Sequence, residues 1–221
     1  SLPLADNAVV SLAKAIDAIG STKLPWHPSR EAENYIQGFT EPQGGIAHKL
    51  SPILLHPFWG PRLLPYAVPS TAKRAAVEGV LRNTANPTGL TGSSAINVIP
   101  GSASVEIDGR LAPGQTAASL IEELTSIIRP VLSDNFEFTI LQESPPVIFS
   151  ANTPLYEEMV KTMQSADPDG HVMPSIIPGF TDSRNYAKLG ATCYGFYPLQ
   201  LPEDIDFATL FHGDDERLSL I

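Results

Sequence analysis

The fold of this chain is decided by one stretch, Ala95-Ile-Asn97-Val-Ile-Pro100-Gly-Ser-Ala-Ser-Val-Glu-Ile-Asp108-Gly-Arg110-Leu-Ala-Pro113-Gly-Gln-Thr116. A Pro-Gly pair at 100–101 marks a turn, and apolar and polar side chains then alternate as they do along a strand. A second Pro-Gly pair at 113–114 ends the alternation, and Thr116 is placed to cap a helix. The pattern predicts a strand, a turn, a strand, a turn and the start of a helix.

Two polar side chains in this stretch are candidates for chemistry. Asn97 stands between apolar neighbours, and Arg110 stands near the end of the second strand. If both converge at one end of a hairpin, their amide and guanidinium groups suit an oxyanion or a carboxylate. The alternative is structural: Asn97 satisfies the backbone of the turn, and Arg110 forms a surface ion pair. The residues alone leave both interpretations open.

The same motifs resemble the lid-domain hairpin of the M20 metallopeptidase family. The resemblance is carried by Asn97-Val-Ile-Pro100 and Asp108-Gly-Arg110-Leu, and further along the chain by Pro178-Gly-Phe-Thr181-Asp182-Ser-Arg184 and Phe211-His212-Gly213-Asp-Asp-Glu216-Arg217. The order of these segments makes the resemblance specific. The family includes aminoacylase, acetylornithine deacetylase, succinyl-diaminopimelate desuccinylase and carboxypeptidase relatives.

Composition narrows the classes of partner. The chain has 221 residues and a formal net charge of −10, with 24 acidic and 14 basic residues. This balance gives no electrostatic basis for nucleic-acid binding. The single cysteine, Cys193, excludes an internal disulfide and is expected to be a packed, inert thiol. No signal peptide or membrane-length apolar run is present, so we expect a cytoplasmic protein without a membrane partner.

The first part of the chain predicts a lid domain over residues 1–143. Asp6 is placed to cap a helix that runs to about residue 19, a strand signal covers 76–91, and the 95–116 hairpin follows. An amphipathic helix at 116–129 should end at Pro130, before an alternating strand at 136–140. With the resemblance, this order implies a ferredoxin-like βαββαβ sandwich that lacks its first strand, and hence a chain that starts one element late.

Residues 20–75 form a proline-rich insertion in that domain, with predicted helices at 28–36 and 46–55. The apolar, proline-broken segment 51–66 is interpreted as packing on the lid. The alternative is a contact with a membrane surface, but the pattern lacks a basic polar face. His27, His48 and His56 lie in this region without ligand-like spacing, and a structural role is expected for each.

The second part of the chain, residues 144–221, predicts an incomplete α/β domain. A linker at 143–146 precedes a helix from Thr153 to about 166, with an inward apolar face. A short strand at 171–176, a helix at 182–189 and a strand at 191–197 follow. Alternation of this kind is typical of a mostly parallel sheet. The resemblance identifies this part as the C-terminal portion of a zinc-hydrolase catalytic domain.

The resemblance also assigns roles. It implies that His212 is the last protein ligand of a two-zinc site, that Asn97 helps to bind the tetrahedral oxyanion, and that Arg110 clamps the substrate carboxylate. It places Gly179 and Thr181 at the substrate, although Thr181 is equally suited to cap the following helix. The implied reaction cleaves the amide bond of a small peptide or an N-acyl amino acid with a free carboxylate.

Other parts of the family's metal site have no counterpart in this sequence. Neither an H-x-D pair nor a Glu-Glu pair stands in the expected context, since His212-Gly-Asp214 belongs to the motif already described. The doublets at 122–123 and 157–158 are interpreted as solvated helix faces. We therefore expect the chain alone to be inactive and the rest of the site to belong to other sequence. The resemblance implies a homodimer formed through the lid domain. The alternative function is a non-catalytic dimerisation or ligand-binding module.

Overall fold

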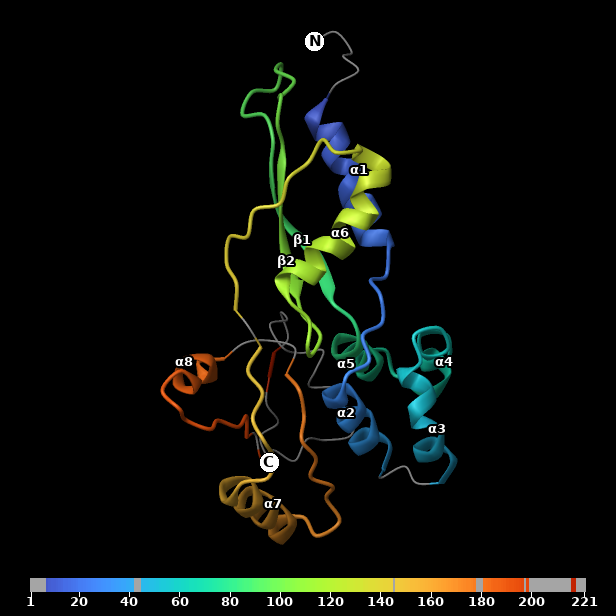
Figure 1. Ribbon diagram of the computed structural model, residues 1–221, viewed down its shortest axis with the longest axis vertical. Helices are drawn as coiled ribbons and strands as arrows, with labels where there is room; N and C mark the ends of the chain where they lie inside the picture. Colours follow the sequence, from blue (N-terminus) through green and yellow to red (C-terminus); the bar gives the residue numbers. More distant parts are fainter. Residues whose placement is uncertain are drawn as a thin grey trace. The chain divides into compact units, whose positions relative to one another are not determined.

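The computed structural model describes residues 7–41, 45–144, 146–177, 181–196, 198 and 216–217. The chain divides into two units, one of residues 1–27 and 82–145 and the other of residues 28–81 and 146–221. Within the described residues, helices are combined with one two-stranded antiparallel sheet, which confirms a mixed α/β class (Figure 1). None of the helices described is long and apolar enough to cross a membrane.

The first unit is built from a helix, a β-hairpin and a second helix. Helix α1 (Ala8–Ser21) begins at Asn7, whose side chain accepts hydrogen bonds from Val9 N at 3.0 Å and Val10 N at 3.4 Å. The cap is therefore Asn7, while Asp6 lies outside the described residues. Strands β1 (Thr84–Thr91) and β2 (Ser104–Arg110) pair in antiparallel register, from Thr84 opposite Arg110 to Thr91 opposite Ser104.

Helix α6 (Ala117–Leu132) completes this unit and covers the hairpin. Thr116 caps it as predicted, in a reciprocal capping box with Ser119. The helix continues past Pro130, contrary to the prediction. The missing proline N–H removes one backbone bond, but Leu132 beyond it still packs on the core and offsets that loss. The buried core contains Ala15, Ile19, Leu24, Leu120, Leu124 and Ile128.

The hairpin and α6 approach each other closely at Gly109. A Cβ atom at this position would lie 2.6 Å from Leu120 Cδ2, a distance that real side chains do not tolerate. A side chain there would force Leu120 to shift, so the glycine of the Asp-Gly-Arg motif lets α6 lie directly on β2 just before Arg110. This close contact fixes where the end of β2 sits in the first unit.

The second unit is mostly helical in its described part. Its helices are α2 (Arg30–Thr40), α3 (Gly45–Leu55), α4 (Gly60–Ala67), α5 (Thr71–Leu81), α7 (Pro154–Ala166) and α8 (Ser183–Ala187). Helix α2 contacts α3 and α5, and α3 contacts α4. The predicted helices at 28–36, 46–55 and 153–166 are confirmed, the last with Thr153 as its cap. On the predicted inward face of α7, Met159, Val160 and Met163 are half-buried, whereas Leu155 is exposed and no residue of the helix is fully buried.

The predicted strand at 76–91 is wrong in its first part. Helix α5 ends at Leu81 and β1 begins only at Thr84. Val77, Val80 and Leu81 are three and four positions apart, and all three are buried. This spacing places them on one face of a helix, so the apolar signal was helical in period rather than alternating.

The strands predicted at 136–140, 171–176 and 191–197 are also wrong within the described residues, none of which is in a strand there. A strand exists through its hydrogen-bonded neighbour, and these segments pair with no described segment. The side-chain pattern of the first was nevertheless informative. Phe136 and Phe138 pack against the core with their rings edge to face, 5.7 Å apart.

Helix α8 is shorter than the predicted helix at 182–189. It spans Ser183–Ala187 with Lys188 as its C-cap, so the helix ends before the predicted stop at Gly190; a turn leads on to Gly190, whose φ is 80°. Cys193 is half-buried.

Candidate functional site

The two candidate residues of the hairpin lie at its opposite ends. Asn97 belongs to the loop 92–103 that connects β1 to β2, whereas Arg110 is the last residue of β2 and lies opposite Thr84. Between them runs β2, about 20 Å of extended chain. Figure 1 shows the hairpin as a long ribbon with this loop at its tip. The expectation that both side chains converge at one end is therefore wrong, because the strand before the turn was placed at 95–99 and lies at 84–91.

Asn97 is exposed at the tip and does not hold the turn together. The backbone there is held by Ser93, whose Oγ donates to Ala95 O at 2.9 Å and accepts from Ala95 N at 3.2 Å. Val98 N also donates to Ala95 O at 3.2 Å. Ser93 thus carries out the turn-stabilising role that was the structural alternative for Asn97. The Asn97 amide is presented outward, between the exposed side chains of Ile96 and Val98.

Arg110 forms an ion pair with Asp108 in this structure. Its Nη2 lies 2.8 Å and its Nε 3.1 Å from Asp108 Oδ2, and the two side chains are 39% and 45% exposed. Residues two apart share one face of a strand, so the pairing follows from the Asp-x-Arg spacing. An exposed pair of this kind contributes about 0.2–1 kcal/mol. The interaction is weak enough for a better-placed carboxylate to replace Asp108.

A buried network of polar side chains connects the Arg110 end of the hairpin to helix α6. Asn83, only 1% exposed, precedes β1; its Oδ1 accepts from Ala112 N at 2.9 Å and its Nδ2 donates to Glu123 Oε2 at 3.1 Å. The other oxygen of Glu123 contacts His27 Nε2. One side chain thus connects the start of β1, the chain just after β2 and helix α6. The network holds Arg110 on a rigid element.

Sequence reasoning missed this network. Glu123 was expected to be on a solvated face, but its side chain is only 11% exposed and accepts from two partners. The available signal was Arg82-Asn83, a polar pair set between the buried helix end at Leu81 and the strand. The expected structural role of His27 is confirmed by its bond to Glu123.

A small hollow lies at the same end of the hairpin. It has a volume of about 210 Å³ and is bordered by the end of α1 and the start of β1, including Thr84, the cross-strand partner of Arg110. Arg82 forms one wall: its Nη1 donates to Leu24 O at 3.0 Å, and its guanidinium stacks 4.5 Å from the ring centre of Trp26. The hollow carries a basic lining from Lys23 and Arg82, but Arg110 itself does not line it.

The remaining site candidates belong to the second unit. Thr181 Oγ1 accepts from Ser183 N at 3.3 Å and donates to Ser183 Oγ at 2.8 Å, whereas the N-cap of α8 is Asp182, whose side chain makes no capping bond. Thr181 thus bonds locally at the start of α8 but is not its N-cap. Gly179 and His212 lie outside the described residues.

The described residues do not fit a zinc site. No three His, Cys, Asp or Glu side chains gather there as metal ligands would. Two of the histidines of the insertion take part in local contacts instead. His56 Nδ1 accepts from Phe58 N at 3.1 Å and from Trp59 N at 3.3 Å, and His48 Nδ1 lies 3.4 Å from Thr40 Oγ1. These contacts agree with the structural roles expected for both.

The family model and the similar proteins of known name indicate the same family for this chain. Residues 2–135 match the family described as the peptidase dimerisation domain of M20 proteins. The N-fatty-acyl-amino acid synthase/hydrolase PM20D1 of Homo sapiens is 29% identical over 147 residues, which is 64% of this chain and 28% of that protein. Its counterpart in Xenopus tropicalis is 32% identical over 127 residues, 56% of this chain and 23% of that protein.

A probable carboxypeptidase S-like protein of Dictyostelium discoideum is 25% identical over 220 residues, which is 100% of this chain and 40% of that protein. The chain thus spans well under half the length of the relatives it matches. No solved structure matches it. Because the family match covers more than half of the chain, this protein belongs to the M20 peptidase family and carries its dimerisation domain.

Proposed function

We propose that this chain is the lid domain (1–143) and the C-terminal part of the catalytic domain (144–221) of an M20 hydrolase. The substrate is an N-acyl amino acid or a small peptide with a free carboxylate. The names of the relatives support this class: one is named an N-fatty-acyl-amino acid synthase/hydrolase and the other a probable carboxypeptidase S-like protein. Both kinds of molecule carry a carboxylate next to an amide bond.

The proposal rests on the separation of Asn97 and Arg110. Residues about 20 Å apart along one rigid hairpin do not bind the two ends of the same small scissile group. In a twofold dimer, the second copy presents the same surface as the first. The hairpin tip of one copy then reaches the substrate site at the Arg110 end of the other copy. The composite site contains Arg110 of one chain and Asn97 of its partner, in a homodimer formed through the lid.

Each side chain has a defined task in this site. The guanidinium of Arg110 leaves Asp108 and binds the substrate carboxylate through two parallel N–H bonds, a geometry that a planar fork favours. The exposed amide of Asn97 donates a hydrogen bond to the oxyanion that forms on the scissile carbonyl. Rigid support for the first task comes from Asn83 and Glu123 behind the strand.

The metal part of the proposal rests on sequence alone. His212 is one ligand of a two-zinc site, and the remaining ligands and the general base lie outside this chain, which is inactive by itself. Gly179 and Thr181 contact the substrate, for which Thr181 must give up its bond to Ser183. A cytoplasmic location belongs to the same proposal.

Subunit complementation tests the composite site. In a protein that carries this chain with a complete catalytic domain, Asn97→Ala and Arg110→Ala should each inactivate the homodimer. Co-expression of the two variants should restore activity, because a mixed dimer has one site with an intact Asn97 and an intact Arg110. With random pairing, half of the dimers are mixed and each has one good site, so about a quarter of wild-type kcat is expected.

Asn86→Ala is the matched control, since Asn86 is also an exposed asparagine of the first unit but lies on β1. It should retain full activity. Absence of recovery in the mixed dimers, with dimer exchange confirmed by differently tagged subunits, would mean that both residues act within one chain or neither acts on the substrate.

A further inference from the structure

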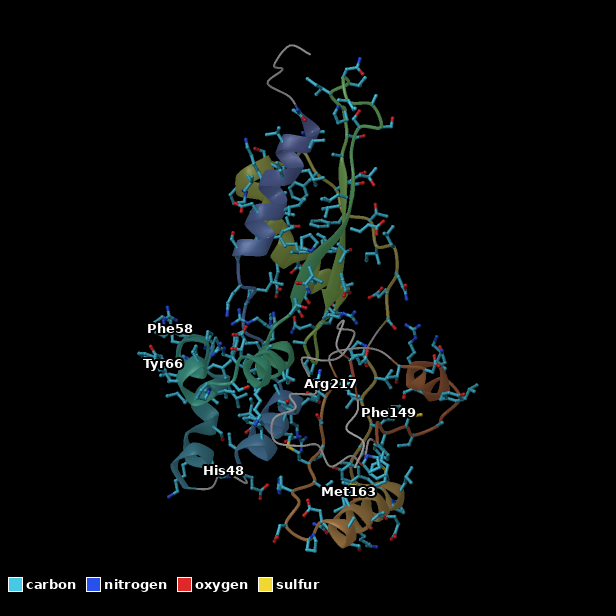
Figure 2. The ribbon with its side chains drawn as sticks, turned by 180° about the vertical axis from the view of Figure 1, so that it is seen from behind. His48, Phe58, Tyr66, Phe149, Met163 and Arg217 are labelled. Carbon is cyan, nitrogen blue, oxygen red and sulfur yellow. The ribbon has the colours of Figure 1, made fainter. Side chains whose placement is uncertain are left out.

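The turn before helix α4 and the helix itself expose a row of aromatic side chains. Phe58, Trp59 and Tyr66 are 52%, 49% and 83% exposed, while Leu64 of the same helix is fully buried. Arg62 and Tyr66 are four residues apart within α4, a spacing that places both on one helix face. Phe58 and Trp59 lie in the turn that leads into the helix. Figure 2 shows Phe58 and Tyr66 on the outer side of this helix. Phe58, Trp59, Arg62 and Tyr66 are called the aromatic face below.

The aromatic face is held in place by local bonds. His56 Nδ1 accepts from Phe58 N at 3.1 Å and Trp59 N at 3.3 Å, which fixes the turn before α4. Arg62 Nη1 donates to Phe58 O at 2.7 Å, and its guanidinium lies 3.8 Å from the centre of the Phe58 ring. The Phe58 and Trp59 rings meet edge to face at 5.0 Å. These rings are therefore exposed in an ordered arrangement, so docking them costs little conformational entropy.

The stretch of sequence that contains this face has a charge opposite to that of the whole chain. Residues 42–77 contain no Asp or Glu, although the net charge of the chain is −10. The same stretch carries Lys49, Arg62, Lys73 and Arg74. A segment that combines exposed aromatic rings with basic residues and lacks carboxylates is complementary to a negatively charged surface.

We propose that the aromatic face is a peripheral docking site for a lipid surface with anionic headgroups. Trp and Tyr have an apolar ring and a polar group, and this makes them favourable at the boundary between headgroups and acyl chains. Basic side chains near that boundary add electrostatic attraction to anionic lipids. The proposal departs from the expectation of no membrane partner, which rested on the absence of a regular basic face in the 51–66 pattern.

The size of the face favours lipid over a protein partner. Three aromatic side chains, two of them about half exposed and Tyr66 mostly exposed, offer roughly 300–400 Å² of surface. A stable protein–protein interface buries about 800 Å² on each partner. Interfacial insertion of a few aromatic residues, assisted by charge, needs no such area because each ring enters the lipid boundary on its own.

Vesicle flotation tests the proposal. The chain should float with vesicles of phosphatidylcholine and phosphatidylglycerol, bind much less to phosphatidylcholine alone, and be released at 0.5 M salt, roughly three times the physiological ionic strength. Trp59→Ser/Tyr66→Ser should lower the partition coefficient at least about tenfold. Arg62→Gln should lower it about fivefold on anionic vesicles, and Arg62→Lys less, because it keeps the charge.

Two controls make the result specific. Tyr186→Ser/Phe196→Ser removes two other exposed aromatic side chains and should leave flotation unchanged. Trp59→Phe should still float but should lose the shift of tryptophan emission to shorter wavelength on vesicle binding, because Trp26 is buried in the core.

Three outcomes would overturn the proposal. The first is no binding to anionic vesicles. The second is an equal loss of binding in the Tyr186→Ser/Phe196→Ser control. The third is self-association of the chain without vesicles that disappears in Trp59→Ser/Tyr66→Ser, since this face would then be occupied by a second copy. Circular dichroism and thermal unfolding of each variant should match wild type, as the replaced side chains are exposed.

Discussion

Replacing Asn83 by alanine should destabilise the first unit more than any surface change. Asn83 is buried and bonds both Ala112 N and Glu123. The alanine variant leaves the N–H of the fully buried Ala112 without its partner, at a cost of about 1–3 kcal/mol. It also removes a hydrogen bond to a charged group, which contributes about 1.5–3 kcal/mol. We expect a total loss of about 3–5 kcal/mol in the free energy of unfolding.

The assay is urea unfolding followed by tryptophan fluorescence. Trp26 belongs to the first unit and Trp59 to the second, so a Trp59→Phe background makes the signal report the unit that contains Asn83. The midpoint and slope of the transition give the free energy of unfolding for each variant. Because the two units need not unfold together, a probe confined to one unit is essential.

Two further variants decide whether the reasoning is right. Asn86→Ala makes the same change at an exposed position of β1 and should alter the free energy by less than about 0.5 kcal/mol. Asn83→Asp keeps the acceptor for Ala112 N but places a carboxylate oxygen beside Glu123, so it should be strongly destabilising at neutral pH. The account of the network is refuted if Asn83→Ala behaves like Asn86→Ala, or if Asn83→Asp is as stable as wild type.

Other predictions follow from the same unit and from the proposed site. Gly109→Ala should cost about 1–3 kcal/mol through its clash with Leu120, and Leu120→Ala in the same chain should recover part of the loss; simple additivity would contradict the clash. In the complete enzyme, Arg110→Ala should cost about 2–5 kcal/mol in kcat/KM for a free-acid substrate and much less for its amide, with Arg110→Lys also impaired; equal losses on acid and amide would mean a purely structural role. The isolated chain should not retain two zinc ions after dialysis, because His212 alone cannot complete a four-coordinate site; two equivalents by metal analysis would contradict this.

The sequence by itself determined the local features that depend on neighbours along the chain. The Thr116 cap and the apolar stripe of α6 were predictable because each arises from contacts within a few residues. The family was readable for a related reason: its motifs are short runs of residues with fixed spacing. The match of residues 2–135 to the dimerisation domain confirms that interpretation.

Only the tertiary structure decided which residues meet. The strand that pairs with β2 is 84–91 rather than 95–99, and this single shift moves Asn97 from a shared site with Arg110 to the opposite end of the hairpin. Which segment pairs with β2 depends on long-range contacts, and the two candidate segments have similar β propensity. Their local sequence patterns therefore do not distinguish them. The burial of Glu123 also depends on contacts between segments that are distant in sequence, because its partners His27 and Asn83 are 96 and 40 positions away. An acidic residue on an amphipathic helix appears solvated in sequence until the fold supplies its hydrogen-bond donors.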